Sequence, residues 1–85
     1  MTINLPNLGP ASAAMLTAAG IHDVDALRAL GVPAAYVAVR RAGTRPSLNL
    51  LWALEGALSG RRWQDVARDD RLRLLLEVER LEGKT

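Results

Sequence analysis

The sequence predicts an all-α fold, a compact bundle of four to five short helices. Alanine and leucine are its most frequent residues, and both enter a helix at little entropic cost. Only 4% of the residues are aromatic and none is phenylalanine, so the chain lacks the side chains that sheets favour. With 85 residues, of which 49% are hydrophobic, the chain suits one packed domain over residues 1–85.

Glycine and proline divide the first half of the chain into three helices. Proline is favoured at the first position of a helix, and glycine is favoured just past its last residue. The side chain of Asp23 is in addition a suitable N-terminal cap. These boundaries predict helices over 10–19, before Gly20, over 24–30, before Gly31, and over 33–42, before Gly43.

In the second half, Ser47 is the expected cap of a helix over 48–59. This helix is apolar on most of its circumference, which places it in the middle of the bundle. It also carries a narrow stripe of small residues, which indicates tight internal packing or, alternatively, a dimer seam. Residues 61–68 are expected as a turn or a short helix, and a last helix is expected over 69–82. The small stripe consists of Asn49, Ala53, Gly56 and Gly60.

The last helix separates a charged face from an apolar face. Leu72 and Leu76 lie at the edge between the two faces, where we expect them half exposed and able to contact a partner. Oppositely charged residues three or four positions apart can pair on a helix surface. The expected pairs are Asp69–Arg73, Arg73–Glu77 and Glu77–Arg80, and the expected core residues are Leu74, Leu75, Val78 and Leu81.

The net charge is only +2, but residues 28–62 carry six arginines and a single glutamate. Five of these arginines form two groups, one at each end of the helix over 48–59. The length of that helix separates the two groups by roughly 20 Å. Such patches suit contacts with a DNA backbone, although arginines near helix C-termini are also favoured for structural reasons. We expect both tryptophans, Trp52 and Trp63, in the core. The two basic groups are Arg40, Arg41 and Arg45, and Arg61 and Arg62.

Several classes of function are excluded by composition. There is no cysteine and a single histidine, so thiolate chemistry and the usual multi-histidine metal centres are absent. His22, Asp23 and Asp25 are too poorly placed to converge on a metal ion. We therefore expect no enzyme, no cofactor and no small-molecule substrate. No apolar run is long enough to span a membrane and the N-terminus lacks a signal-peptide pattern, so we expect a cytoplasmic protein.

The segment before the first helix is the most informative turn. A tight turn feeds a helix with apolar residues every three or four positions, in the sequence Leu5-Pro6-Asn7-Leu8-Gly9-Pro10. This arrangement resembles a helix-hairpin-helix, or sterile-alpha-motif-like, unit. In such units the turn and the helix N-terminus offer backbone N–H groups to a nucleic-acid phosphate. Asn7 and Gly9 are thus candidate phosphate contacts, with a purely structural hairpin as the alternative.

A wider pattern extends over most of the chain. It consists of the Leu5–Pro10 turn, Ala19-Gly20-Ile21-His22, Leu27-Arg28-Ala29-Leu30-Gly31, Ser47-Leu48-Asn49-Leu50-Leu51-Trp52-Ala53-Leu54-Glu55-Gly56-Ala57-Leu58, Gly60 and Trp63. It resembles the C-terminal domain of the TfoX (Sxy) family over roughly residues 3–80, and residues 47–58 are the most distinctive part.

The resemblance implies an all-helical, non-enzymatic domain with a regulatory or adaptor role. Proteins of that family promote expression of DNA-uptake genes during natural competence in bacteria, together with a cyclic-AMP-responsive activator. Full-length members carry an α/β domain ahead of this one, so a complete protein of this sequence would be a stand-alone C-terminal domain.

Two hypotheses follow for the function. The first is a non-catalytic module that docks on a protein partner or on itself, through the Arg40, Arg41 and Arg45 region and through Leu72 and Leu76. The alternative is weak, sequence-independent DNA binding through the Asn7–Gly9 hairpin and both groups of arginines.

Overall fold

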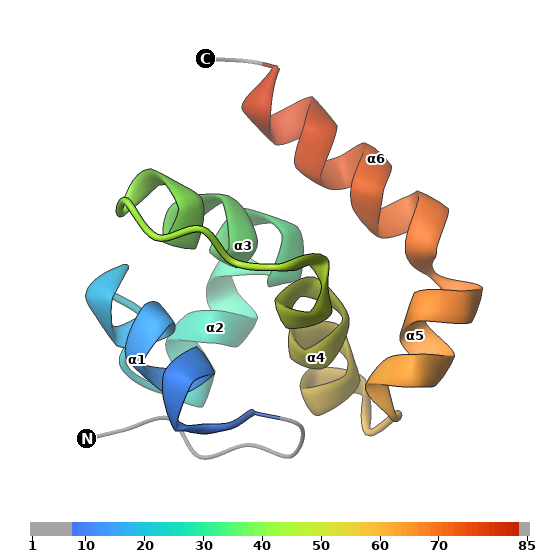
Figure 1. Ribbon diagram of the computed structural model, residues 1–85, viewed down its shortest axis with the longest axis horizontal. Coiled ribbons are helices and arrows are strands. Elements are labelled where there is room, and N and C mark those ends of the chain that lie inside the picture. Colours follow the sequence, from blue (N-terminus) through green and yellow to red (C-terminus); the bar gives the residue numbers. More distant parts are fainter. Residues whose placement is uncertain (1–7, 84–85) are drawn as a thin grey trace.

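The computed structural model describes residues 8–83, which form six α-helices and no strand (Figure 1). The all-α prediction is confirmed. The described chain has one helix more than the predicted maximum because the segment left open between a turn and a short helix is a full helix, α5. The helices are α1 (Pro10–Ala18), α2 (Val24–Leu30), α3 (Val32–Arg41), α4 (Leu48–Ser59), α5 (Trp63–Asp69) and α6 (Arg71–Glu82).

Of the two predicted helix caps, Asp23 makes its capping hydrogen bond and Ser47 does not. Asp23 caps α2 as predicted, because its Oδ1 accepts a hydrogen bond of 2.7 Å from the backbone N–H of Ala26. This bond satisfies one of the N–H groups that the first turn of a helix leaves without a partner. Ser47 also lies at the N-cap position of α4, but its side chain makes no capping hydrogen bond there. The position of this second cap is thus predicted correctly, while its interaction is not.

Two glycines determine how consecutive helices meet. Gly31 has φ 90° and ψ 150°, and it both ends α2 and begins α3 with no other residue between them. Gly60 has φ 75° and ψ 21°, and its N–H donates to the carbonyl of Gly56 at the end of α4. Both lie in regions of positive φ that side chains other than glycine adopt only with strain. The chain therefore turns sharply at these two points.

The core lies around α4. In Figure 1, α4 occupies the centre, with α1, α2 and α3 on one side and α5 and α6 on the other. Its buried residues span nearly its whole circumference, as the apolar pattern predicted, and they include Ala53 and Gly56 of the small stripe. This part of the stripe packs within the chain rather than at a dimer seam. The buried residues of α4 are Leu50, Leu51, Trp52, Ala53, Leu54 and Gly56.

The interior of the described chain is apolar throughout. Within residues 8–83 the buried side chains are all hydrophobic or aromatic, and none is charged. The helices α3 and α6 pack against each other, and α6 contributes Leu74 and Val78 to the core as predicted. Leu75 and Leu81, also predicted in the core, are only partly buried and pack against it. Apolar burial is the main force that holds such a bundle together.

The expectation that Trp63 lies in the core is wrong. Its side chain is 36% exposed, whereas Trp52 is buried as predicted. Trp63 is the first residue of α5, and the fully buried residue of that helix is Val66. Trp63 and Val66 lie on one face of α5, so the start of this face stays near the surface while its middle reaches the core.

The predicted pair Asp69–Arg73 is also wrong. The sequence suggests one helix over 69–82, but Asp69 ends α5 and the next residue separates it from α6. The two side chains therefore do not share a helix face, and Asp69 pairs with Arg68 at 3.0 Å instead. The pair Glu77–Arg80 lies within α6 and is formed, at 2.7 Å. The predicted pair Arg73–Glu77 also lies within α6 but is not formed among the described residues, because Arg73 pairs with Asp70 at 2.9 Å.

No helix of the described residues has the length and apolar character needed to cross a membrane.

Candidate interaction surfaces

The first predicted basic group, Arg40, Arg41 and Arg45, surrounds the connection between α3 and α4. Arg40 forms an ion pair, whereas Arg41 and Arg45 form none within residues 8–83. Arg40 turns back onto the protein. Its Nη1 donates to both carboxylate oxygens of Glu82, each at 3.0 Å, and its guanidinium lies 5.4 Å from the centroid of the Tyr36 ring. Arg40 therefore joins the C-terminal end of α3 to that of α6, and its charge is balanced by a carboxylate.

Tyr36, which is buried, joins α3 to the connection that leads to α4. Its hydroxyl donates a 3.3 Å hydrogen bond to the carbonyl oxygen of Pro46, in the connection that leads to α4. Burial raises the pKa of the Tyr36 hydroxyl, and the nearby charge of Arg40 opposes this rise. An aromatic side chain that could otherwise stack on a base is thus buried and occupied by structural contacts.

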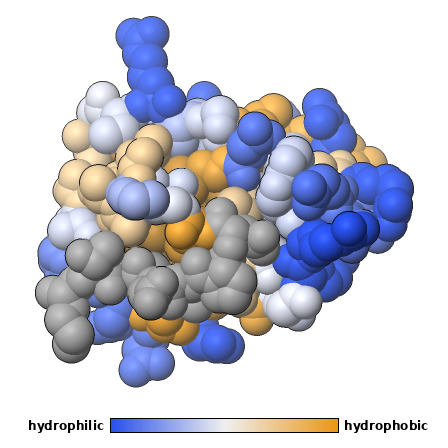
Figure 2. Space-filling model, turned by 60° about the horizontal axis from the view of Figure 1, so that its bottom comes forward, coloured by the Kyte–Doolittle hydropathy of each residue, from blue (hydrophilic) through white to orange (hydrophobic). Residues whose placement is uncertain are grey.

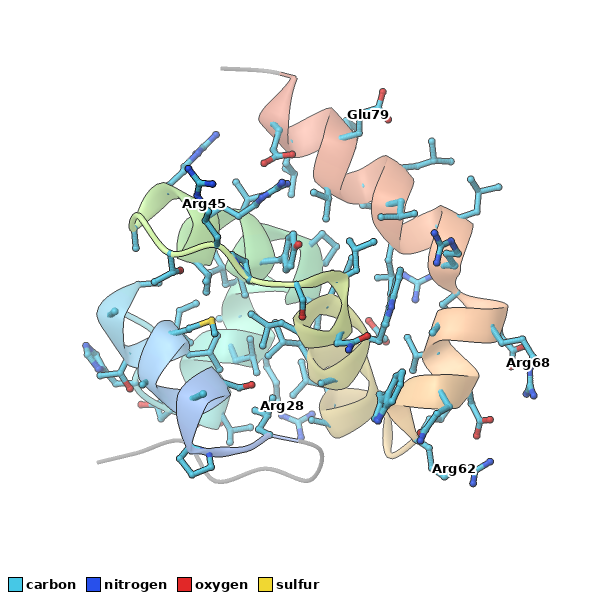
Figure 3. All side chains as sticks on the ribbon, viewed as in Figure 1. Arg28, Arg45, Arg62, Arg68 and Glu79 are labelled. Carbon is cyan, nitrogen blue, oxygen red and sulfur yellow. The ribbon has the colours of Figure 1, made fainter. Side chains whose placement is uncertain are left out.

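Arg41 and Arg45 remain available on the surface. Both guanidinium groups lack an ion pair with any residue between 8 and 83, and Arg41 is exposed. Figure 3 shows Arg45 beside the α3–α4 connection, where its side chain is exposed. A hollow of ≈ 440 Å³ lies at this connection, lined by Arg40, Gly43, Thr44, Arg45 and Pro46.

The second predicted basic group is neutralised by acids. Arg61 donates to Oδ2 of Asp70, and Arg62 lies 3.4 Å from Asp65. Arg73 donates to the same Asp70 at 2.9 Å. Hydrogen bonds from Arg73 and Arg61 lower the pKa of Asp70, so this carboxylate keeps its charge further into the acid range than an ordinary aspartate.

The surface over α5 is consequently of mixed charge rather than basic. Arg68 adds contacts to Asp65 and Asp69, and its hydrogen bond lowers the pKa of Asp69. Figure 2 shows strongly hydrophilic side chains gathered at one end of the molecule. Among the residues described, the two basic groups do not form one continuous positive surface.

Only half of the predicted hairpin can be placed. Gly9 is exposed and lies at the N-cap of α1, with φ −88° and its carbonyl accepting from Ala13 at 3.1 Å. Asn7 lies outside the described residues. Gly9 has an ordinary backbone conformation and makes an ordinary helix start.

The outer side of α6 carries the most exposed large apolar side chains of the described chain. Leu72 is 70% exposed and Leu76 is 55% exposed, which confirms the prediction that both lie at the surface. With Glu79 they follow the spacing i, i+4, i+7, so the three side chains share one face of the helix. We call Leu72, Leu76 and Glu79 the α6 ridge.

A hollow on another side of the molecule is not predicted from the sequence. It has a volume of ≈ 470 Å³ and lies between the ends of α1 and α2, one face of α3 and the end of α6. Its lining is almost wholly apolar, and Leu30 within it is 45% exposed. We call it the α3 groove; its lining residues are Ala18, Ala19, Leu30, Ala34, Val37, Ala38, Arg41, Ala42 and Leu81.

The comparisons with known proteins give one result. The family model of the TfoX C-terminal domain matches residues 2–78. No curated protein and no solved structure gives a significant match.

Proposed function

The chain belongs to the TfoX C-terminal domain family, and we propose that it is a non-catalytic regulatory or adaptor module that acts through protein–protein contacts. Because that family promotes the expression of DNA-uptake genes, the proposed setting is transcription regulation in competent bacteria. The observation that carries the proposal is the α6 ridge. Burying one leucine contributes about 1.5–3 kcal/mol, so the two exposed leucines provide a useful share of a binding energy.

The distribution of charge supports protein docking over DNA binding. A DNA backbone calls for several unpaired cations on one surface. Here Arg40, Arg61 and Arg62 are all held by carboxylates. Among the arginines without an ion pair in the described chain, Arg28 on α2 lies on a different side of the molecule from Arg45 beside α3 (Figure 3).

The proposal is tested by placing a photo-crosslinking amino acid at Leu76 and irradiating cells that contain the protein. We expect a discrete adduct with a protein partner or with a second copy of this chain, identified by mass spectrometry. A matched probe at Arg68, which is exposed among paired charges on α5, should give no such adduct. Adding Leu72→Glu to the Leu76 probe should lower the yield at least about tenfold, since about 1.4 kcal/mol corresponds to a factor of ten. A Leu76 probe that gives no protein adduct contradicts the proposal.

The second candidate function is weak DNA binding, which Arg41 and Arg45 favour because neither forms an ion pair in the described chain. It is tested by fluorescence anisotropy with a duplex of about 20 base pairs and a single strand at two salt concentrations. If this candidate is right, Arg41→Ala and Arg45→Ala each reduce the salt slope by about one unit. Arg62→Ala serves as the matched control and should leave the slope unchanged, because Asp65 already holds that guanidinium. Absence of binding at low salt excludes this candidate.

A further inference from the structure

We propose that the α3 groove is the docking site for helix α6 of a second copy of this chain, so that copies associate head to tail. The inference rests on the proposed docking role of the α6 ridge. It identifies the partner of that ridge as the α3 groove of a second copy.

The α3 groove has the properties of a receptor for a helix. Its floor is made by Ala34, Val37 and Ala38, which all belong to α3. Alanines leave room for the backbone of a second helix to approach closely, because the distance between packed helices depends on the side chains at their contact. Arg41 lies at one end of this floor, and its guanidinium has no ion-pair partner among residues 8–83.

The α6 ridge supplies the complementary features. Leu72 and Leu76 are large, apolar and mostly uncovered by the rest of the described chain. Glu79, one turn further on, is exposed and has no ion pair within residues 8–83. Figure 3 shows its carboxylate pointing away from the rest of the molecule at the far end of α6. An amphipathic helix that presents two apolar anchors and a carboxylate is a common ligand of an apolar groove.

The two surfaces match in length and in charge. Leu72 and Glu79 are seven positions apart, as are Ala34 and Arg41, so each pair spans about 10 Å along its helix. When α6 of one copy lies parallel to α3 of another, Leu72 meets Ala34 and Leu76 meets Ala38. Glu79 then reaches Arg41, and the charge of the ridge neutralises that of the groove.

The position of Leu81 decides the symmetry of the association. Leu81 lines the α3 groove, whereas Leu72 and Leu76 lie on the other side of the same helix, about 140–180° away at 100° per residue. One copy therefore cannot offer its ridge and its groove to the same partner. The contact is heterologous, and repeated copies form an open chain or a ring rather than a two-fold dimer.

The contact is small and should be weak. Stable interfaces bury about 1,200–2,000 Å² in total, and one helix face in one groove lies at or below the lower limit. We therefore expect association with dissociation constants in the range of about 10 µM to 1 mM. The association has no fixed end point at the dimer.

Sedimentation velocity of the 85-residue protein over that range tests the inference. The wild-type sedimentation coefficient should rise with concentration. Arg41→Glu and Glu79→Arg should each shift this rise to at least about tenfold higher concentration, because like charges then face each other. An equimolar mixture of the two variants should restore association. In that mixture the unchanged Glu79 meets the unchanged Arg41, and the two reversed residues meet each other.

Arg45→Glu is the matched control for Arg41→Glu. It makes the same change of net charge, but outside the groove, and should therefore leave association unchanged. Circular dichroism checks that every variant is folded. A wild-type protein that stays monomeric at the highest concentration overturns the inference, and so does a mixture of the two reversed variants that stays monomeric. If the Leu76 probe still gives an adduct with another protein in that case, the proposed docking function stands and only the second copy as its occupant is wrong.

Discussion

Replacing Leu54 with alanine is expected to lower the free energy of unfolding by about 3 kcal/mol. Leu54 is fully buried in the middle of α4, which lies between the two halves of the bundle. Removing its branched end leaves a cavity that neighbouring helices cannot collapse into, since helices on both sides hold the walls in place.

This loss is large for so small a protein. A chain of 85 residues is expected to have a stability of roughly 4–13 kcal/mol. Thermal unfolding followed by circular dichroism should show a decrease in Tm of about 12–24 °C. The matched control is Leu72→Ala, which makes the same chemical change at a highly exposed site and should stay within about 0.5 kcal/mol of the wild type. Equal effects at the two sites would contradict the central position of α4.

Replacing Gly31 with alanine is expected to cost about 2 kcal/mol, within the range of about 1–3 kcal/mol for strained backbone positions. Its φ of 90° and ψ of 150° lie in a region that is essentially restricted to glycine. A methyl group at Gly31 would meet no atom within 4 Å, so the cost comes from the backbone and not from a clash.

Gly9 provides the control for this second substitution. A methyl group added at Gly9 would likewise meet no atom within 4 Å, but the φ of this residue is −88°. Gly9→Ala should therefore change the stability by no more than about 0.5 kcal/mol. Urea unfolding of both variants measures the difference. A Gly31→Ala protein as stable as Gly9→Ala would show that the junction of α2 and α3 relaxes to an ordinary conformation.

The features that sequence analysis predicts well are those that depend on neighbours along the chain. Gly31 and Gly60 end helices because of their own backbone freedom, and the Asp23 side chain reaches an N–H only three residues away. The exposure of Leu72 and Leu76 follows from helical periodicity alone. Each of these predictions needs no knowledge of how the helices pack.

The features that it misses depend on segments that are distant in sequence or on a weak local signal. The pair Arg40–Glu82 joins residues 42 positions apart, so no local pattern announces that Arg40 is neutralised. The break between α5 and α6 contains neither glycine nor proline, which is why Asp69 is assigned to the wrong helix. The α3 groove exists only once α1, α2 and α6 have assembled around α3. Its one sequence signal is the second apolar face of α3, at Ala34, Val37 and Ala38.

The apolar interior of residues 8–83 has a consequence for how this sequence can change. Apart from Tyr36, whose hydroxyl bonds Pro46, an interior substitution is judged by volume and shape. Swaps such as leucine to methionine therefore cost less than about 1.5 kcal/mol. A library that varies the interior among apolar residues, while Tyr36 and the glycines at the helix junctions are kept, would yield many folded members that keep the same surface side chains.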